Sequence, residues 1–142
     1  MQALLRDALA GRGHAAPVAT LRALAHDAVA VRHRLATMNG AVAGFWKVVA
    51  ESPALRARTR ELSEELEREL ARMLASSVAA PIDDPTARLL AAMLVGAWRV
   101  AFREALHRQR TARSASARNA LLELLDRGFL AVSAAARDTQ YG

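Results

Sequence analysis

The stretch from Asp84 to Arg110, DPTARLLAAMLVGAWRVAFREALHRQR, decides the fold because its first half is apolar on nearly every side. Asp84 can cap a helix, and Pro85 suits the first helical position. At 3.6 residues per turn, one side of this helix carries Leu90, Leu94, Ala97, Trp98, Ala101 and Ala105. The opposite side carries Leu89, Ala92 and Gly96.

A helix that is apolar all round must be covered on both sides. We expect other helices of the chain to cover the first side and a second copy of the protein to cover the small-residue side at Ala92 and Gly96. Polar residues recur from Arg99 onward, so the C-terminal half of the helix is predicted to lie at the surface.

Helical periodicity and capping residues predict about six helices in all. The others span residues 2–9, 17–38, 41–50 and 117–136, and a stretch that starts at Pro53. That last stretch carries an apolar stripe as far as Met73 and is otherwise charged. Asn39 and Gly40 are expected to stop the second of these helices. Residues 81–85 and 111–116 are expected to form turns, and the tail DTQYG to be frayed.

No window alternates as a strand does, so the predicted class is all-α, with residues 1–142 forming a single domain. The net charge of +6 comes from 19 arginines and one lysine against 14 acidic residues, and such a balance is weak evidence for nucleic-acid binding. The longest apolar run is about half of a membrane span, and no signal peptide is evident. The protein is therefore expected to be cytoplasmic, with no membrane partner.

The sequence offers little support for an enzyme or a metal site. It has no cysteine, and none of its four histidines has another histidine three or four residues away. A single Glu-x-x-His, Glu104 with His107, falls short of the two copies that a di-iron bundle uses. Arginines lie among and beside the glutamates of 61–69, and pairs such as Arg60 with Glu64 predict a row of solvent-exposed ion pairs along the helix. We expect no catalytic residue, no metal and no cofactor.

Apolar binding is the chemistry that remains. The candidate pocket residues are Phe45, Trp46, Leu62, Leu66, Met93, Leu94, Trp98 and Phe102, with the alanines at 97, 101 and 105 leaving room beside them. An ordinary core explains the same spacing. Arg99 and Arg103 lie on the other side of their helix, so they are not expected to hold a ligand there.

Two glycines inside helices suggest an interface between copies. Gly96 and Gly128 each cost about 1 kcal/mol relative to alanine, which a close approach of helices would offset. The last helix also carries more apolar surface than one neighbour covers. The candidate interface residues are Gly96, Leu121, Leu124, Leu125, Gly128, Phe129 and Val132.

The segments FWKVVAESPALRARTRELSEELERELARMLA, DPTARLLAAMLVGAWRVAFREAL and ALLELLDRGFLAV, separated by polar turns, resemble the C-terminal effector-binding domain of TetR-family transcriptional repressors, which are bacterial. The likeness is to the type with acyl-CoA-like ligands that includes mycofactocin regulators, and it covers about residues 17–136. It implies an orthogonal, antiparallel helical bundle, an apolar or amphipathic effector, and a homodimer through the last two helices.

In that family an N-terminal helix-turn-helix reads DNA, and nothing before Gln2 supplies one. Residues 1–12 have no capping residue and are expected to be the remnant of a connecting helix, so duplex DNA would be bound only through a domain outside this chain. A truncated regulator and a natural stand-alone domain both fit. The alternative function is a stand-alone helical small-molecule-binding or protein-interaction module without DNA binding.

Overall fold

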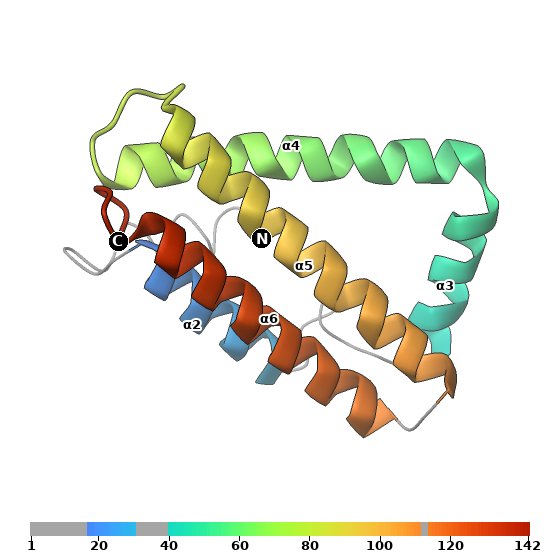
Figure 1. The fold of residues 1–142 in the computed structure, drawn as a ribbon. Helices are drawn as coiled ribbons and strands as arrows, with labels where there is room; N and C mark the ends of the chain where they lie inside the picture. The colour runs from blue at the N-terminus through green and yellow to red at the C-terminus, as the bar shows by residue number, and fades with distance from the viewer. Residues whose placement is uncertain (1–16, 31–39, 112–113) are drawn as a thin grey trace.

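The computed structural model describes residues 17–30, 40–111 and 114–142 (Figure 1). Within these residues all regular structure is helical, which confirms the all-α class. The helices are α2 (Pro17–Ala30), α3 (Gly40–Glu51), α4 (Pro53–Ser77), α5 (Pro85–Thr111) and α6 (Ser114–Ala136). The predicted helix at 2–9, the remnant at 1–12 and the second half of the predicted helix at 17–38 lie outside the described residues.

Helix α5 is the centre of the arrangement. It runs antiparallel to α6, and α4 crosses its N-terminal part (Figure 1). The short helix α3 stands between the start of α4 and the C-terminal part of α5, and α2 lies along α6. The helix formed by the stretch that starts at Asp84 therefore contacts three of the other four described helices.

Local signals set the starts of α4 and α5 as the sequence predicts. Ser52 accepts a hydrogen bond from the backbone N–H of Leu55 at 3.3 Å, and Asp84 Oδ2 accepts one from the N–H of Ala87 at 2.8 Å. Each cap is followed by a proline. The first N–H groups of a helix have no partner within the helix, so the N–H that proline lacks costs no hydrogen bond at this position.

One predicted turn is too long. Gly40 is the first residue of α3, and the predicted end of the preceding helix at Asn39 lies outside the described residues. The predicted turn at 111–116 is shorter, because Thr111 belongs to α5 and α6 begins at Ser114.

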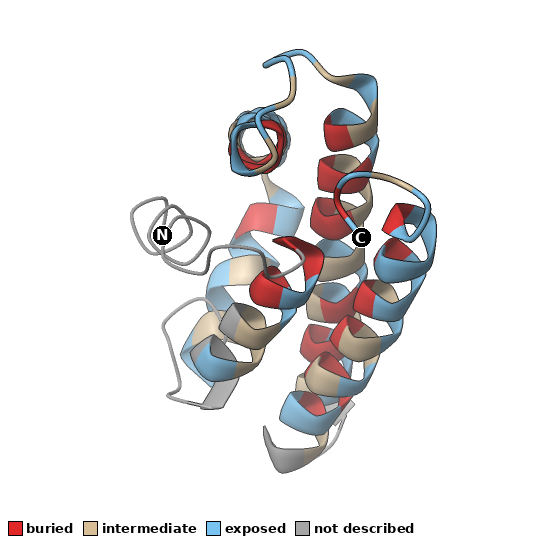
Figure 2. Ribbon diagram, turned by 90° about the vertical axis from the view of Figure 1, so that its left-hand side faces the viewer, coloured by how far each residue is buried: buried red, intermediate tan, exposed pale blue. Residues whose placement is uncertain are grey.

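The core continues further along α5 than the sequence predicts. Ala101 and Ala105 have no exposed surface and Leu106 is also buried, so one face of the C-terminal half of α5 belongs to the core (Figure 2). The exposed residues of this half, such as Arg103 and His107, lie at the surface as predicted. The alanines at 97, 101 and 105 share one face. At the first of them the neighbour is Gly128 of α6, where an added Cβ would lie 2.5 Å from the Cβ of Ala97. At Ala97, therefore, the small side chain lets α6 approach and leaves no room for a ligand.

The apolar face of α6 is also covered within the chain. Four candidate interface residues belong to the buried core, namely Leu121, Leu125, Phe129 and Val132. The other three, Gly96, Leu124 and Gly128, are partly buried. The sequence predicts more apolar surface on α6 than one neighbouring helix can cover. In the structure a second helix, α2, packs on α6 beside α5.

The C-terminal tail is packed and not frayed. Tyr141 has no exposed surface, and its hydroxyl donates a hydrogen bond of 2.9 Å to Asp84. Thr139 holds the turn after α6 through its backbone N–H and its hydroxyl, which both donate to the carbonyl of Ala136. The end of the chain is thus attached to the cap of α5.

Candidate functional site

Four aromatic side chains gather where α3 meets α5, and we call Phe45, Trp46, Trp98 and Phe102 the aromatic cluster. The ring of Trp46 meets Phe102 edge to face, with centroids 5.3 Å apart. Phe102 is stacked with Trp98 at 6.4 Å, and Phe45 meets Trp46 edge to face at 5.6 Å. These are the favoured geometries of aromatic pairs.

Helical spacing explains how α5 presents two of these rings. Trp98 and Phe102 are four residues apart and so lie one above the other on the helix. Trp46 reaches them from α3, which is anchored at its far end by the buried Val49. The chain contains only two tryptophans, and both belong to the aromatic cluster.

The cluster is open to solvent. Trp46, Trp98 and Phe102 are partly buried and pack against the core, whereas Phe45 is 61% exposed. Val48 of the same helix is 57% exposed, so apolar surface continues past the rings. An apolar ligand laid on this surface would exchange water for aromatic contacts.

The remaining candidate pocket residues have different surroundings. Leu94 is a buried core residue, and Leu66 and Met93 are partly buried against the core. Leu62 is 50% exposed. The structure therefore brings the four aromatic residues together in direct ring contacts, while Leu94 serves the packing of α5.

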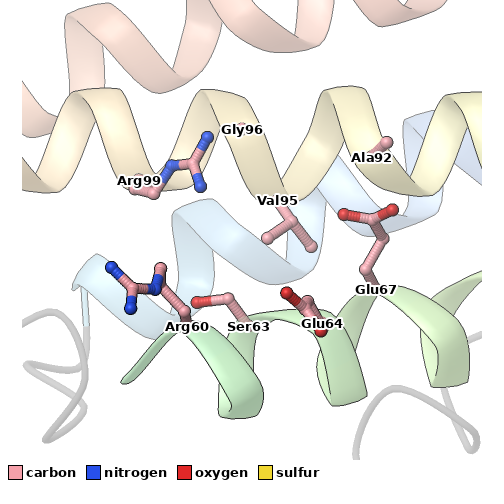
Figure 3. A pocket seen from close by; sticks show the side chains of 8 residues that line it. All are labelled: Arg60, Ser63, Glu64, Glu67, Ala92, Val95, Gly96 and Arg99. Atoms are coloured by element: carbon pink, nitrogen blue, oxygen red, sulfur yellow. The ribbon is translucent and has the colours of Figure 1, made fainter. Parts of the chain in front are cut away.

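A separate pocket of about 120 Å³ lies between α4 and α5 (Figure 3). From α4 it is lined by Arg60, Ser63, Glu64 and Glu67. From α5 it is lined by Ala92, Val95, Gly96 and Arg99. We call this the α4–α5 pocket. The small-residue side of α5 at Ala92 and Gly96 thus faces α4 of the same chain, where the sequence analysis placed a second copy.

Sequence reasoning did not find this pocket, although its spacing is visible. Positions 60, 63, 64 and 67 share one helix face, as do 92, 95, 96 and 99. The row of ion pairs expected on α4 is present in part: Glu69 pairs with Arg72 as predicted, and Arg58 pairs with Glu61 and Glu65. The predicted pair of Arg60 with Glu64 is not among them.

A second charged group joins α2 to α6. Arg22 donates from Nε and Nη2 to Asp126 Oδ1 at 2.9 and 2.7 Å, and Nε2 of His26 lies 2.8 Å from the same oxygen. The hydrogen bond to His26, followed by that to Arg22, lowers the pKa of the Asp126 carboxyl below its ordinary value of 3.8. The group contains no nucleophile, and it serves to join the two helices.

Glu104 of the single Glu-x-x-His accepts a hydrogen bond from Arg108 Nε at 2.9 Å, and His107 is exposed. Within the part of the chain that the structure describes, no three His, Asp or Glu side chains are grouped so that they could hold a metal ion. No helix in that part is long and apolar enough to cross a bilayer.

The chain was compared with protein-family models, with curated proteins and with solved structures, and none of them matches it.

Proposed function

We propose that the chain is the effector-sensing and dimerisation domain of a TetR-type transcriptional regulator, and that its effector is an apolar or acyl-type small molecule bound at the aromatic cluster. The observation that supports this most strongly is the contact of Trp46, Phe102 and Trp98 on a partly exposed surface. A chain with six aromatic residues places four of them at one corner of the fold.

The position of the cluster suits a sensor. Helix α3 contacts both α4 and α5, so a ligand bound at the aromatic cluster, where α3 meets α5, would change how these helices pack against each other. In the proposed regulator such a shift is transmitted to DNA-reading helices outside this chain. That transmission is a coupling between two sites.

The proposed dimer needs a face that the chain leaves uncovered. Leu89 and Val100 on α5 are 59% and 60% exposed. They are eleven residues, or about three turns, apart and therefore lie on one side of the helix. Ala92 and Gly96 on the same side face α4, so Leu89 and Val100 are the exposed residues on either side of this contact. We place the contact between copies at these two residues, because most of the apolar face of α6 is used inside the chain.

The experiment that tests the effector is a thermal-shift screen with fatty acyl and aromatic compounds. A ligand at one hundred times its dissociation constant stabilises the folded state by about 2.7 kcal/mol. At about 3 °C per kcal/mol for a chain of this size, the melting temperature should rise by about 8 °C.

Two variants make the screen specific to the site. Phe102→Leu removes the central ring of the aromatic cluster and should abolish most of the ligand-induced rise. Phe129→Leu, a change of the same type in the core of α6, should lower the starting melting temperature and keep the rise. No rise with any compound, or an equal loss in both variants, would count against binding at the cluster.

A further inference from the structure

The α4–α5 pocket has a division of charge that packing does not explain. Arg60 and Arg99 lie at one end of it and Glu67 at the other, while Ser63, Val95 and Glu64 lie between them (Figure 3). Two separate helices thus contribute positive charge to the same end.

These charges are not neutralised by one another. Arg60 and Glu64 have the i, i+4 spacing at which side chains pair along a helix. Among the ion pairs of the described residues, however, none includes Arg60, Glu64, Glu67 or Arg99. Ser63 uses its hydroxyl proton in a 2.9 Å hydrogen bond to the carbonyl of Thr59, which leaves its oxygen able to accept.

The floor of the pocket is open because of a glycine. No heavy atom lies within 4 Å of the position that a Cβ on Gly96 would occupy. Gly96 therefore does not serve a close approach of helices within the chain, in contrast to Gly128. The pocket volume of about 120 Å³ exceeds what a single water molecule needs and admits a small molecule.

From these observations we infer that the α4–α5 pocket binds a short ω-amino acid, with its carboxylate at Arg60 and Arg99 and its ammonium at Glu64 and Glu67. Arginine is the side chain best suited to a carboxylate, because its planar guanidinium can form two parallel hydrogen bonds. Carboxylates accept the hydrogen bonds of an ammonium group.

The spacing of the charges selects the length of the ligand. Along α4, Glu64 and Glu67 lie about 6 and 10 Å from Arg60 at a rise of 1.5 Å per residue. The charged groups of an α-amino acid share one carbon atom and cannot reach both ends. A chain of three or four methylene groups, as in 4-aminobutyrate or 5-aminopentanoate, separates them sufficiently.

This site is distinct from the aromatic cluster. Arg99 follows Trp98 directly, so its side chain leaves α5 about 100° further round the helix. The inference therefore stands or falls separately from the proposed apolar effector.

The test is a titration of the ¹⁵N-labelled chain with 4-aminobutyrate, followed through the backbone amide signals of Ala92, Val95 and Gly96. Butyrate and butylamine, added at the same ionic strength, each carry one of the two charges. We expect saturable shifts with 4-aminobutyrate in the millimolar range, and at least several-fold weaker binding of the two single-charge compounds. Absence of saturation, or equal shifts from all three compounds, would overturn the inference.

Three variants locate the binding. Gly96→Leu fills the floor of the pocket and should remove the response while the helical circular dichroism stays unchanged. Arg99→Gln should weaken binding several-fold. Arg103→Gln removes the same charge from an exposed position that does not line the pocket and should leave binding as it is. If Arg103→Gln weakens binding as much as Arg99→Gln, the response reflects overall charge and the site is refuted.

Discussion

The hydroxyl of Tyr141 donates a hydrogen bond of 2.9 Å to Oδ2 of Asp84, the same oxygen that accepts the N–H of Ala87 in the first turn of α5. One carboxylate thus caps the central helix and holds the end of the chain. Because Tyr141 has no exposed surface, the ring adds apolar burial to this bond.

Replacing the tail residue should therefore destabilise the whole fold. Tyr141→Phe loses the hydrogen bond to a charged group and should lower the free energy of unfolding by about 1.5–3 kcal/mol. Tyr141→Ala also loses the ring and should cost about 3–5 kcal/mol. Urea unfolding measures both, and an unchanged midpoint for Tyr141→Ala would mean that the tail does not pack.

The same contact predicts a loss of stability in alkali. Burial, followed by the hydrogen bond to Asp84, raises the pKa of Tyr141 from 10.0 to about 12. Because the pKa is higher in the folded state than in the unfolded state, the protonated hydroxyl of Tyr141 stabilises the fold. This contribution is fully present below pH 10 and is lost as the pH rises from about 10 to 12. In Tyr141→Phe the fall over this range should be smaller; equal slopes in variant and wild type would contradict the assignment.

The cluster around Asp126 should show the opposite pH dependence. Its lowered pKa means that the carboxylate stabilises the fold above about pH 4, and that this contribution disappears as the pH falls through the folded-state pKa. Arg22, His26 and Asp126 are each about a third or more exposed, so solvent screens them and the effect is about 0.2–1 kcal/mol.

Asp126→Asn should remove this stabilisation at pH 6 and at low salt, and have less effect in 1 M salt. Urea unfolding at the two salt concentrations checks it. Glu123→Gln is a matched control on α6, because it breaks only the exposed i, i+4 pair with Arg127. A larger loss for Glu123→Gln than for Asp126→Asn would contradict the role given to the α2–α6 contact.

Gly96 of α5 and Gly128 of α6 should respond to alanine in opposite directions. Gly96→Ala meets no atom within 4 Å and should stabilise the chain by about 0.5–1 kcal/mol through helix propensity. Gly128→Ala places a Cβ 2.5 Å from that of Ala97, and overpacking of this kind costs about 1–3 kcal/mol.

Thermal unfolding of the two variants separates these effects. The double variant Gly128→Ala with Ala97→Gly restores the space and should recover much of the loss. Equal stabilisation by both alanines would show that α5 and α6 do not approach closely at this point.

The features that sequence predicts well are those set locally. Caps at Ser52 and Asp84 need only neighbouring residues, and the helices that follow them are confirmed. The contact of Tyr141 with Asp84 joins positions 57 residues apart, and no periodic signal announces it. The tail was therefore predicted wrongly.

Relations between helices were harder to predict for the same reason. The grouping of Trp46 with Trp98 and Phe102 follows from two apolar faces that must pack. The α4–α5 pocket depends on how far each helix is rotated about its axis, and periodicity does not determine that rotation. The glycine at 128 was expected to contact another copy, because sequence alone cannot tell which helix approaches it.

The proposed dimer has its own test in sedimentation. Wild type should be dimeric at tens of micromolar, and Leu89→Glu or Val100→Glu should yield folded monomers, since each places a charge in the proposed contact. Leu130→Glu is the matched control. Leu130 is also 60% exposed, but it lies on the side of α6 opposite the buried Leu121 and is not part of the proposed contact on α5. A monomeric wild type, or dissociation by Leu130→Glu alone, would contradict the proposed face.

Tryptophan emission reports directly on the central proposal, because both tryptophans of the chain lie in the aromatic cluster. The decisive measurement is a fluorescence titration with fatty acyl and aromatic compounds on wild type, Trp46→Phe and Trp98→Phe. An effector bound at the cluster predicts a saturable change of emission in all three proteins. In the wild type, the concentration of a compound at half-saturation should be the same by fluorescence as by thermal shift. Emission that stays constant with every compound would show that the cluster is only part of the packing.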